Sequence, residues 1–266
     1  MDLQLSGKTA LVTGGSRGIG KAIARELARE GMDVAIVARG MDALEATAAE
    51  LARETGRRII PVKADTGDDE AVRSMVEKTV QAFDRIDVLV NCAARPGGQG
   101  LVPSLAEITD DLFWADMNVK VMGYLRCARE VAPHMRRQGW GRIINISGLA
   151  ARSAGSLIGS MRNVAVSAMT KNLAEELGPD GINVTVVHPG LTRTEATSGV
   201  IEARAHAEGA SPGEIEARMA QANSVRRLID AREIAHVVAF LASPKAVAIN
   251  GDAIAAGGGA GSAIHY

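Results

Sequence analysis

Seven short apolar runs, separated by longer amphipathic segments, most constrain the fold of this 266-residue chain. The runs lie at residues 8–13, 33–38, 58–64, 87–93, 141–147, 182–188 and 252–256. Continuous apolar runs are typical of parallel strands that are covered on both faces. Between them, apolar residues recur at helical spacing, as at Val72, Val76 and Val80. This alternation predicts an α/β fold, a doubly wound parallel sheet of about seven strands flanked by helices.

The composition favours one soluble domain and argues against several kinds of partner. The length fits a single domain spanning 1–266, and 47% of the residues are hydrophobic. The net charge is −1 without any basic block, so we expect no nucleic-acid or membrane partner. Cys92 and Cys127 lack C-x-x-C or metal-ligand spacing, and we expect free thiols and no metal. With no signal-peptide pattern at the start, we predict a cytoplasmic protein.

One segment, 192–224, breaks the alternation of strands and helices. It is polar, helical in pattern and without a predicted strand. Ligands of open α/β sheets bind beyond the carboxyl ends of the strands, and this segment leaves the sixth strand at that end. We therefore predict a helical lid over a ligand. A pair of surface helices is the alternative.

A glycine-rich turn at 13–20, TGGSRGIG, follows the first predicted strand and precedes a helix. Gly14, Gly18 and Gly20 let the backbone turn sharply, approach a pyrophosphate and pack the helix on the strand. The N–H groups and the dipole of that helix favour the phosphates. This context predicts a Rossmann-type dinucleotide site, although the spacing is G-x-x-x-G-x-G. A tight turn that binds nothing is the alternative.

The end of the second strand indicates which nucleotide binds. An acidic residue there would hold the ribose 2′-hydroxyl of NAD, but this chain has Ala38 and Arg39. A guanidinium can bind a 2′-phosphate, and Arg17 in the glycine turn is a second candidate. We predict that NADP(H) is preferred over NAD(H). Arg39 as a solvated loop cation is the alternative.

Several motifs together resemble the short-chain dehydrogenase/reductase (SDR) family over nearly the whole chain. They are TGGSRGIG (13–20), KADTGDDEAV (63–72), NCAA (91–94), MNVKVMGYLRCAREVAPHM (117–135), GRIINIS (141–147) and HPGLTRT (188–194). The resemblance implies an NAD(P)-binding Rossmann domain that exchanges hydride with a small carbonyl or alcohol substrate. It also implies a homodimer or homotetramer, assembled through the helices at 117–135 and 159–177.

The glycine turn, Arg39 and the resemblance together define the predicted cofactor site. It consists of Gly14, Ser16, Arg17, Gly18, Ile19, Gly20, Arg39, Asp65, Thr66, Asn91, Ala93, Asn163, Pro189, Gly190, Thr192 and Thr194.

The predicted catalytic end departs from the family. Its members use a tyrosine, a lysine four residues later, a serine and an asparagine. The resemblance places Gly159 and Asn163 at the tyrosine and lysine positions. Asn118 matches the asparagine, with a structural role as an equal alternative. Ser147 lies one place before the serine position, which Gly148 occupies.

Another side chain is therefore expected to replace the tyrosine as proton donor. His188 lies at the carboxyl end of a strand and titrates near neutrality unless perturbed, so it is the best alternative acid; a neutral, hydrogen-bonded histidine is the other interpretation. The predicted catalytic residues are thus Asn118, Ser147 and His188. Tyr124 is expected to be a packing residue, and Arg162 is expected to face solvent or an interface.

Three functions remain open from the sequence. The first is an NADP-dependent oxidoreductase with a non-standard proton donor. The alternative is a catalytically inactive NADP-binding sensor or partner subunit. An isomerase or lyase on the same fold is a weaker third.

Overall fold

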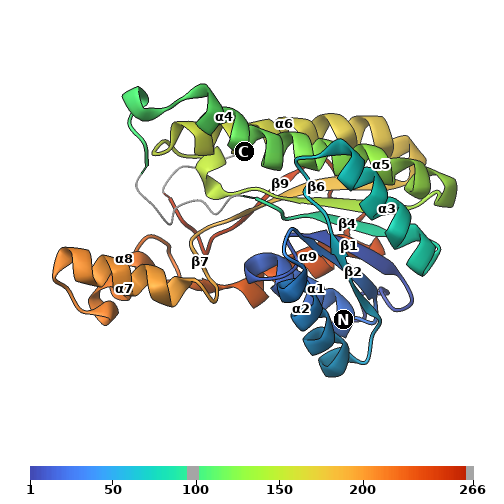
Figure 1. Ribbon diagram of the computed structural model, residues 1–266, viewed down its shortest axis with the longest axis horizontal. Coiled ribbons are helices and arrows are strands. Elements are labelled where there is room, and N and C mark those ends of the chain that lie inside the picture. The colour runs from blue at the N-terminus through green and yellow to red at the C-terminus, as the bar shows by residue number, and fades with distance from the viewer. Residues whose placement is uncertain (95–101, 262–266) are drawn as a thin grey trace.

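A seven-stranded parallel sheet forms the centre of the computed structural model, which describes residues 1–94 and 102–261 (Figure 1). Its strand order is β3-β2-β1-β4-β5-β6-β9. The strands are β1 (Thr9–Thr13), β2 (Asp33–Ala38), β3 (Ile59–Lys63), β4 (Val88–Asn91), β5 (Gly141–Ile146), β6 (Ile182–Pro189) and β9 (Ala253–Ala256). Each coincides with one of the seven apolar runs, so the predicted doubly wound sheet is confirmed.

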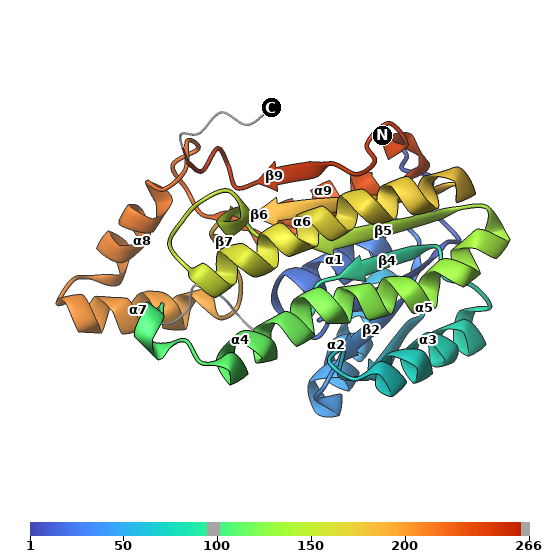
Figure 2. The same cartoon turned by 90° about the horizontal axis from the view of Figure 1, so that it is seen from above.

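Helices cover both faces of the sheet (Figures 1 and 2). One face carries α1 (Gly18–Arg29), α2 (Met41–Thr55) and α9 (Ala231–Ala242); the other carries α3 (Asp69–Phe83), α5 (Gly123–Gln138) and α6 (Leu157–Leu177). Successive strand residues point to opposite faces, so Val12 packs in the α1 layer and Leu11 in the α3–α5 layer. Both faces being buried explains why the strands are continuously apolar.

The segment after β6 forms a projection beyond the carboxyl ends of the strands (Figure 2). It holds α7 (Thr197–Glu208) and α8 (Pro212–Ala220), which share a small apolar core around Ile201 and Ile215. The expectation of a segment without strands is wrong at its first residues. There β7 (Thr192–Arg193) pairs in parallel with β8 (Ile229–Asp230), and this pairing joins the two ends of the projection.

A helical irregularity precedes α5. The helix α4 (Asp110–Met117) continues through a π-helical turn at Asn118–Met122 into α5. Such turns are rare and recur at functional sites. Short 3₁₀ turns lie at Leu105–Glu107, Leu149–Ala151, Gly178–Asp180 and Pro244–Ala246.

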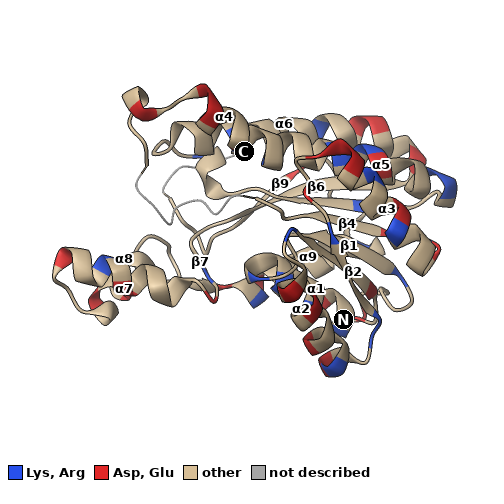
Figure 3. Cartoon of the chain, in the orientation of Figure 1, with Lys and Arg blue, Asp and Glu red and all other residues tan. Residues whose placement is uncertain are grey.

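Residues of both charge signs are interspersed along the helices and loops of the chain (Figure 3). This distribution agrees with the expectation from the sequence that the chain has no basic block. Across 1–94 and 102–261, no helix combines the length and apolar character needed to span a bilayer.

Candidate functional site

The glycine turn between β1 and α1 has the close contacts that glycine alone permits. Gly14 and Gly18 have φ angles of +69° and +59°. A Cβ on Gly14 would lie 2.9 Å from the carbonyl oxygen of Cys92, and one on Gly20 would lie 2.2 Å from that of Gly14. The turn therefore requires these glycines in order to pack against the end of β4 and to start α1.

An anion already lies at the N-terminus of α1. The backbone N–H of Gly18 donates a hydrogen bond of 3.0 Å to Oε2 of Glu195, which precedes α7. The side chain of the N-cap residue Arg17 makes no capping hydrogen bond, and the first turn of the helix contains no acidic residue. The carboxylate thus lies where backbone N–H donors and the helix dipole stabilise a negative charge. The residues present fit the pyrophosphate of a dinucleotide.

The side chain of Thr13 links the glycine turn to the loop after β4 by hydrogen bonds. Its Oγ1 accepts hydrogen bonds from the backbone N–H groups of Cys92 and Ala93, at 3.0 and 3.1 Å. Ala93 therefore takes part through its backbone, next to Gly14. The glycine turn and the loop after β4 therefore lie against each other, although they are far apart in sequence.

Asn91 was expected to bind the cofactor, but the structure places its side chain inside the protein. It is fully buried, and its Nδ2 donates to Oδ1 of Asn145 at 2.9 Å. Asn145 in turn donates to Oγ1 of Thr170 on α6 at 2.9 Å. The side chain of Asn91 thus belongs to a hydrogen-bonded chain that connects β4, β5 and α6. Because it is fully buried, it has no exposed side-chain surface that could contact a ligand.

The two arginines proposed to bind a 2′-phosphate have exposed side chains. Arg39 follows β2 and Arg17 lies in the glycine turn; both are exposed. Among the residues that the structure describes, neither guanidinium makes a hydrogen bond or an ion pair. Both therefore have free donors near the predicted adenosine end.

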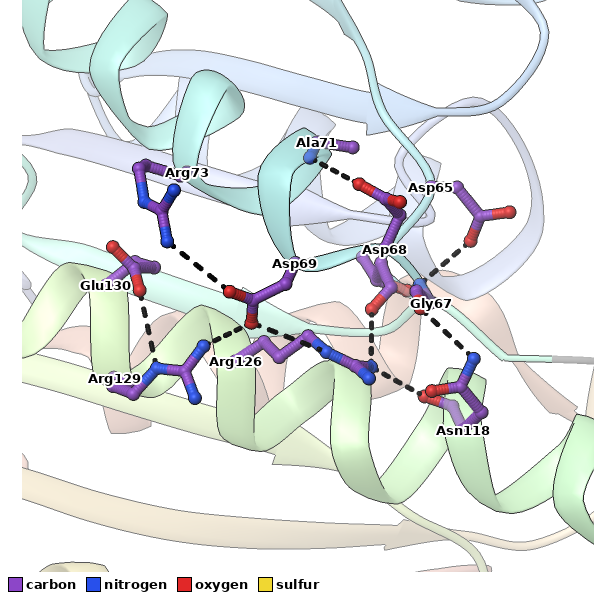
Figure 4. Close-up of polar contacts among 11 residues, drawn as sticks. Asp65, Gly67, Asp68, Asp69, Ala71, Arg73, Asn118, Arg126, Arg129 and Glu130 are labelled. Atoms are coloured by element: carbon purple, nitrogen blue, oxygen red, sulfur yellow. Dashed lines mark hydrogen bonds and ion pairs between the residues drawn. The ribbon is translucent and has the colours of Figure 1, made fainter.

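Asp65 and Asn118 organise the loop after β3 from opposite sides (Figure 4). Oδ1 of Asp65 accepts from the N–H of Gly67 at 2.9 Å, and Nδ2 of Asn118 donates to the carbonyl of Gly67 at 3.1 Å. Arg126 of α5 donates to the carbonyls of both Thr66 and Asn118, each at 3.3 Å. The amide of Asn118 is therefore bound to backbone, as its structural interpretation predicts.

The segment after β6 returns to the glycine turn. A Cβ on Gly18 would lie 3.7 Å from Cγ2 of Thr194, and one on Gly190 would lie 2.8 Å from Cα of Gly257. Thr192 donates from Oγ1 to the carbonyl of Gly190 at 3.0 Å. The structure thus brings Pro189, Gly190, Thr192 and Thr194 to the same edge of the sheet as Ser16, Gly18 and Ile19.

At the start of α6, Gly159 lies under the helix cap. Oγ of Ser156 accepts from the N–H of Gly159 at 3.1 Å, and a Cβ on Gly159 would lie only 2.7 Å from that oxygen. One turn later, Asn163 is buried and its Oδ1 accepts from Oγ of Ser147 at 3.2 Å. A Cβ on Gly148 would lie 3.2 Å from Nδ2 of Asn163. The structure thus brings Ser147, Gly148 and Asn163 together.

His188 is a buried and fully bonded histidine. Its Nδ1 accepts from the N–H of Gly148 at 3.4 Å, and its Nε2 lies 3.3 Å from Oγ of Ser167. Burial, followed by the positive charges of Arg152 and Lys120, lowers the pKa of His188 to about 4. This corrects the expectation that His188 titrates near neutrality, because its charged form is disfavoured in this environment.

Arg162 does not face solvent, contrary to expectation. It is buried, and its Nη1 lies 2.5 and 2.6 Å from the two carboxylate oxygens of Asp116 on α4. The position of Arg162 along the helix suggested an exposed side chain. In the structure, α4 covers that side of α6 and Arg162 is buried.

Lys120 is the residue that the sequence analysis missed. It lies in the π-helical turn, is 4% exposed, and donates from Nζ to the carbonyl of Ser147 at 3.0 Å. Burial, and then the charge of Arg162, lowers the pKa of Lys120 to about 7. The available signal was a lysine within an apolar stretch, two residues after Asn118.

The tyrosine on α5 is a packing residue, as predicted. The hydroxyl of Tyr124 donates to the carbonyl of Ile146 at 2.9 Å, and burial raises the pKa of this phenol well above its usual value. Tyr266 lies outside the described residues. Within the described part of the chain, no cluster of His, Cys, Asp and Glu could hold a metal ion.

The parallel sheet, the glycine turn and the anion-binding start of α1 define a dinucleotide-binding protein of Rossmann type. The family model described as enoyl-(acyl carrier protein) reductase matches residues 14–261. The chain belongs to the short-chain dehydrogenase/reductase family, whose members are NAD(P)-dependent oxidoreductases.

Individual relatives match almost the whole chain. The short-chain reductase protein NovJ of Streptomyces niveus is 37% identical over 94% of this chain and 92% of NovJ. L-Sorbose reductase from Gluconobacter frateurii, solved in complex with NADPH and L-sorbose, has 30% sequence identity to this chain. Its structure superimposes with a TM-score of 0.92 over 99% of this chain and 100% of that one. An NAD⁺-bound xylitol dehydrogenase is 29% identical with a TM-score of 0.87, covering 96% and 100%.

Proposed function

We propose that this protein is an NADP-dependent oxidoreductase that interconverts a carbonyl and an alcohol on a small substrate with a non-standard proton donor. The observation that carries this proposal is the glycine turn, whose Gly18 N–H binds a carboxylate where a pyrophosphate would lie. The glycine contacts leave no room for side chains there. When bound, the cofactor supplies the hydride.

The preference for NADP(H) rests on Arg39 and Arg17. Both are exposed, and we assign them to the 2′-phosphate. The comparisons alone leave the choice open, because the sorbose reductase structure contains NADPH and the xylitol dehydrogenase structure contains NAD⁺.

The unusual chemistry rests on the N-terminal half of α6. We assign Gly159 and Asn163 to the places of the family's tyrosine and lysine, and α6 contains no tyrosine at all. Its one lysine, Lys171, is exposed and paired with Glu175. Asn163 can orient Ser147 by hydrogen bonding but has no charge with which to stabilise an anion.

The first experiment is a titration of the purified protein with NADPH and NADH, followed by nicotinamide fluorescence and calorimetry. We expect binding of both with a clear preference for NADPH. Absence of binding would overturn the oxidoreductase and the sensor proposals together, because both require the glycine turn to hold a nucleotide.

The second candidate function is a catalytically inactive NADP-binding sensor or partner subunit, which Gly159 and Asn163 favour. Back-substitution separates the two candidates. Because a Cβ on Gly159 would clash with Ser156, the variant should combine Gly159→Tyr and Asn163→Lys with Ser156→Gly, which weakens the cap by only a few tenths of a kcal/mol. Carbonyl reduction that appears only in this variant supports the sensor. Reduction by the native protein supports the enzyme.

The surroundings of the site extend the proposal. The α7–α8 projection acts as a lid, since Glu195 at its base already contacts the glycine turn. Exposed apolar side chains on the helices at 117–135 and 159–177, namely Met122, Met161 and Val164, favour a homodimer or homotetramer. The remaining features are a cytoplasmic location, a small-molecule substrate, and no nucleic-acid or membrane partner.

A further inference from the structure

Lys120 brings a positive charge close to Asn163, which carries none at the position of the family's lysine. Its ammonium group reaches from the π-helical turn to the carbonyl of Ser147, at the end of β5. Oγ of the same Ser147 donates to Asn163. Nζ of Lys120 is therefore linked through Ser147 to Asn163, the side chain at the position of the family's lysine.

This ammonium has no counterion. Among the described residues, no carboxylate forms an ion pair with Lys120. The nearby Asp116 is bound to Arg162 instead. The pKa of Lys120 is also affected by the charge of Arg162 on α6 and by the Cys92 thiol after β4. The charge of Lys120 in turn helps to lower the pKa of His188 on β6. A buried cation without a partner is costly, and a ligand that brings negative charge would relieve that cost.

The ammonium also has unused donors. One N–H of Nζ is bound to Ser147, and two remain for a ligand atom. Tyr124, one turn later, cannot serve the same purpose, because its hydroxyl already donates its single proton to the carbonyl of Ile146. Lys120 is thus the one group in this cluster that combines a positive charge, a transferable proton and free donor capacity.

We propose that Lys120 binds and protonates the substrate oxygen, in place of the tyrosine–lysine pair of the family. This inference rests on the proposed oxidoreductase function. As hydride from the reduced cofactor adds to the carbonyl carbon, the C=O π bond breaks and its electron pair passes to the oxygen. The oxygen takes a proton from Nζ, which gives the alcohol and the oxidised cofactor. The neutral amine then regains a proton from water.

The first test needs no turnover. In protein labelled with ¹⁵N and ¹³C at lysine, the Lys120 resonance is assigned by its loss in Lys120→Met and is followed by NMR against pH. We expect it to titrate far below the other lysines, and acetate to raise its midpoint by about one pH unit. Acetamide, the neutral analogue, should leave the midpoint unchanged. A normal lysine midpoint, or equal effects of acetate and acetamide, would overturn the proposal.

The second test uses hydride transfer from NADPH to a panel of small ketones and α-diketones. We expect Lys120→Met to lower kcat by about 10²–10⁴-fold and to abolish the pH dependence near neutrality, with the Kd for NADPH unchanged. Lys120→Arg should keep part of the rate but lose that pH dependence. Lys171→Met, which removes an exposed lysine, is the matched control. Native kcat and pH profile in Lys120→Met would contradict the proposal.

The two tests separate the failure of each claim. If the native protein binds NADPH but reduces no carbonyl, the oxidoreductase function fails, and the acetate titration alone decides whether Lys120 is an oxyanion-binding group. If reduction occurs without dependence on Lys120, the function stands and the assignment of Lys120 is wrong.

Discussion

The carboxylate of Glu195 accepts a hydrogen bond from the backbone N–H of Gly18, so a side chain from the base of α7 occupies the start of α1. A bound pyrophosphate would meet this negative charge. We expect Glu195→Gln to tighten NADPH binding by about 2–5-fold, the size of one charge at a helix terminus. Calorimetry measures the change, with Glu202→Gln on α7 as the control. Weaker binding in Glu195→Gln would mean that Glu195 supports the nucleotide.

Arg39 is expected to set the nucleotide preference. Arg39→Asp removes a donor for the 2′-phosphate and adds a repelling charge, so we expect about 10–100-fold weaker NADPH binding with NADH binding retained. Arg53→Asp makes the same change of charge on α2, at an exposed position. A preference for NADPH that survives Arg39→Asp would transfer the assignment to Arg17.

The ion pair between Arg162, which is buried, and Asp116, which is partly buried, joins α6 to α4. We expect Arg162→Met to lower the free energy of unfolding by about 3 kcal/mol, because Asp116 is left without its partner. Adding Asp116→Asn should restore much of that loss. Arg136→Met, which breaks an exposed pair with Asp180, should cost less than about 1 kcal/mol. Urea unfolding provides the comparison, and similar losses in the two single variants would contradict this prediction.

His188 makes stability depend on pH in the acidic range. Its pKa is lowered from 6.5 to about 4 in the folded protein, so the unfolded chain binds its proton more readily. The contribution of His188 is therefore complete above pH 6.5 and declines as the pH falls toward 4, by up to about 3 kcal/mol. The difference in unfolding free energy between native protein and His188→Gln isolates this effect. A difference that does not change with pH would refute it.

Lys120 is expected to reduce stability at neutral pH. Its pKa is lowered from 10.5 to about 7 in the folded protein, so folding disfavours the charged form. The stability of the native protein should therefore rise relative to Lys120→Met as the pH increases from 7 to 10.5. Near pH 7, we expect Lys120→Met to be the more stable protein, because methionine places no charge at this buried position. Chemical denaturation at several pH values measures this, and a less stable Lys120→Met at neutral pH would show that packing of the lysine stem dominates.

The sequence alone determined the architecture, because each prediction depended on local patterns. Continuous apolar runs are required of strands buried on both faces, and all seven became strands of one parallel sheet. The glycine turn was equally predictable, since the positive φ angle of Gly14 and the close backbone contacts at Gly14 and Gly20 admit no other residue. The resemblance to the family rested on the same local motifs.

Only the tertiary structure decided the electrostatics of the site. The largely buried pairing of Arg162 with Asp116, the lowered pKa of His188 and the approach of Lys120 to Ser147 each depend on groups from different elements. Burial and neighbouring charges set the protonation of a side chain, and neither is written in the spacing of residues along one helix. The resemblance of the sequence to the family therefore indicated where a proton donor is expected, while the packing of the π-helical turn against β5 brought Lys120, the donor that we propose, to the carbonyl of Ser147.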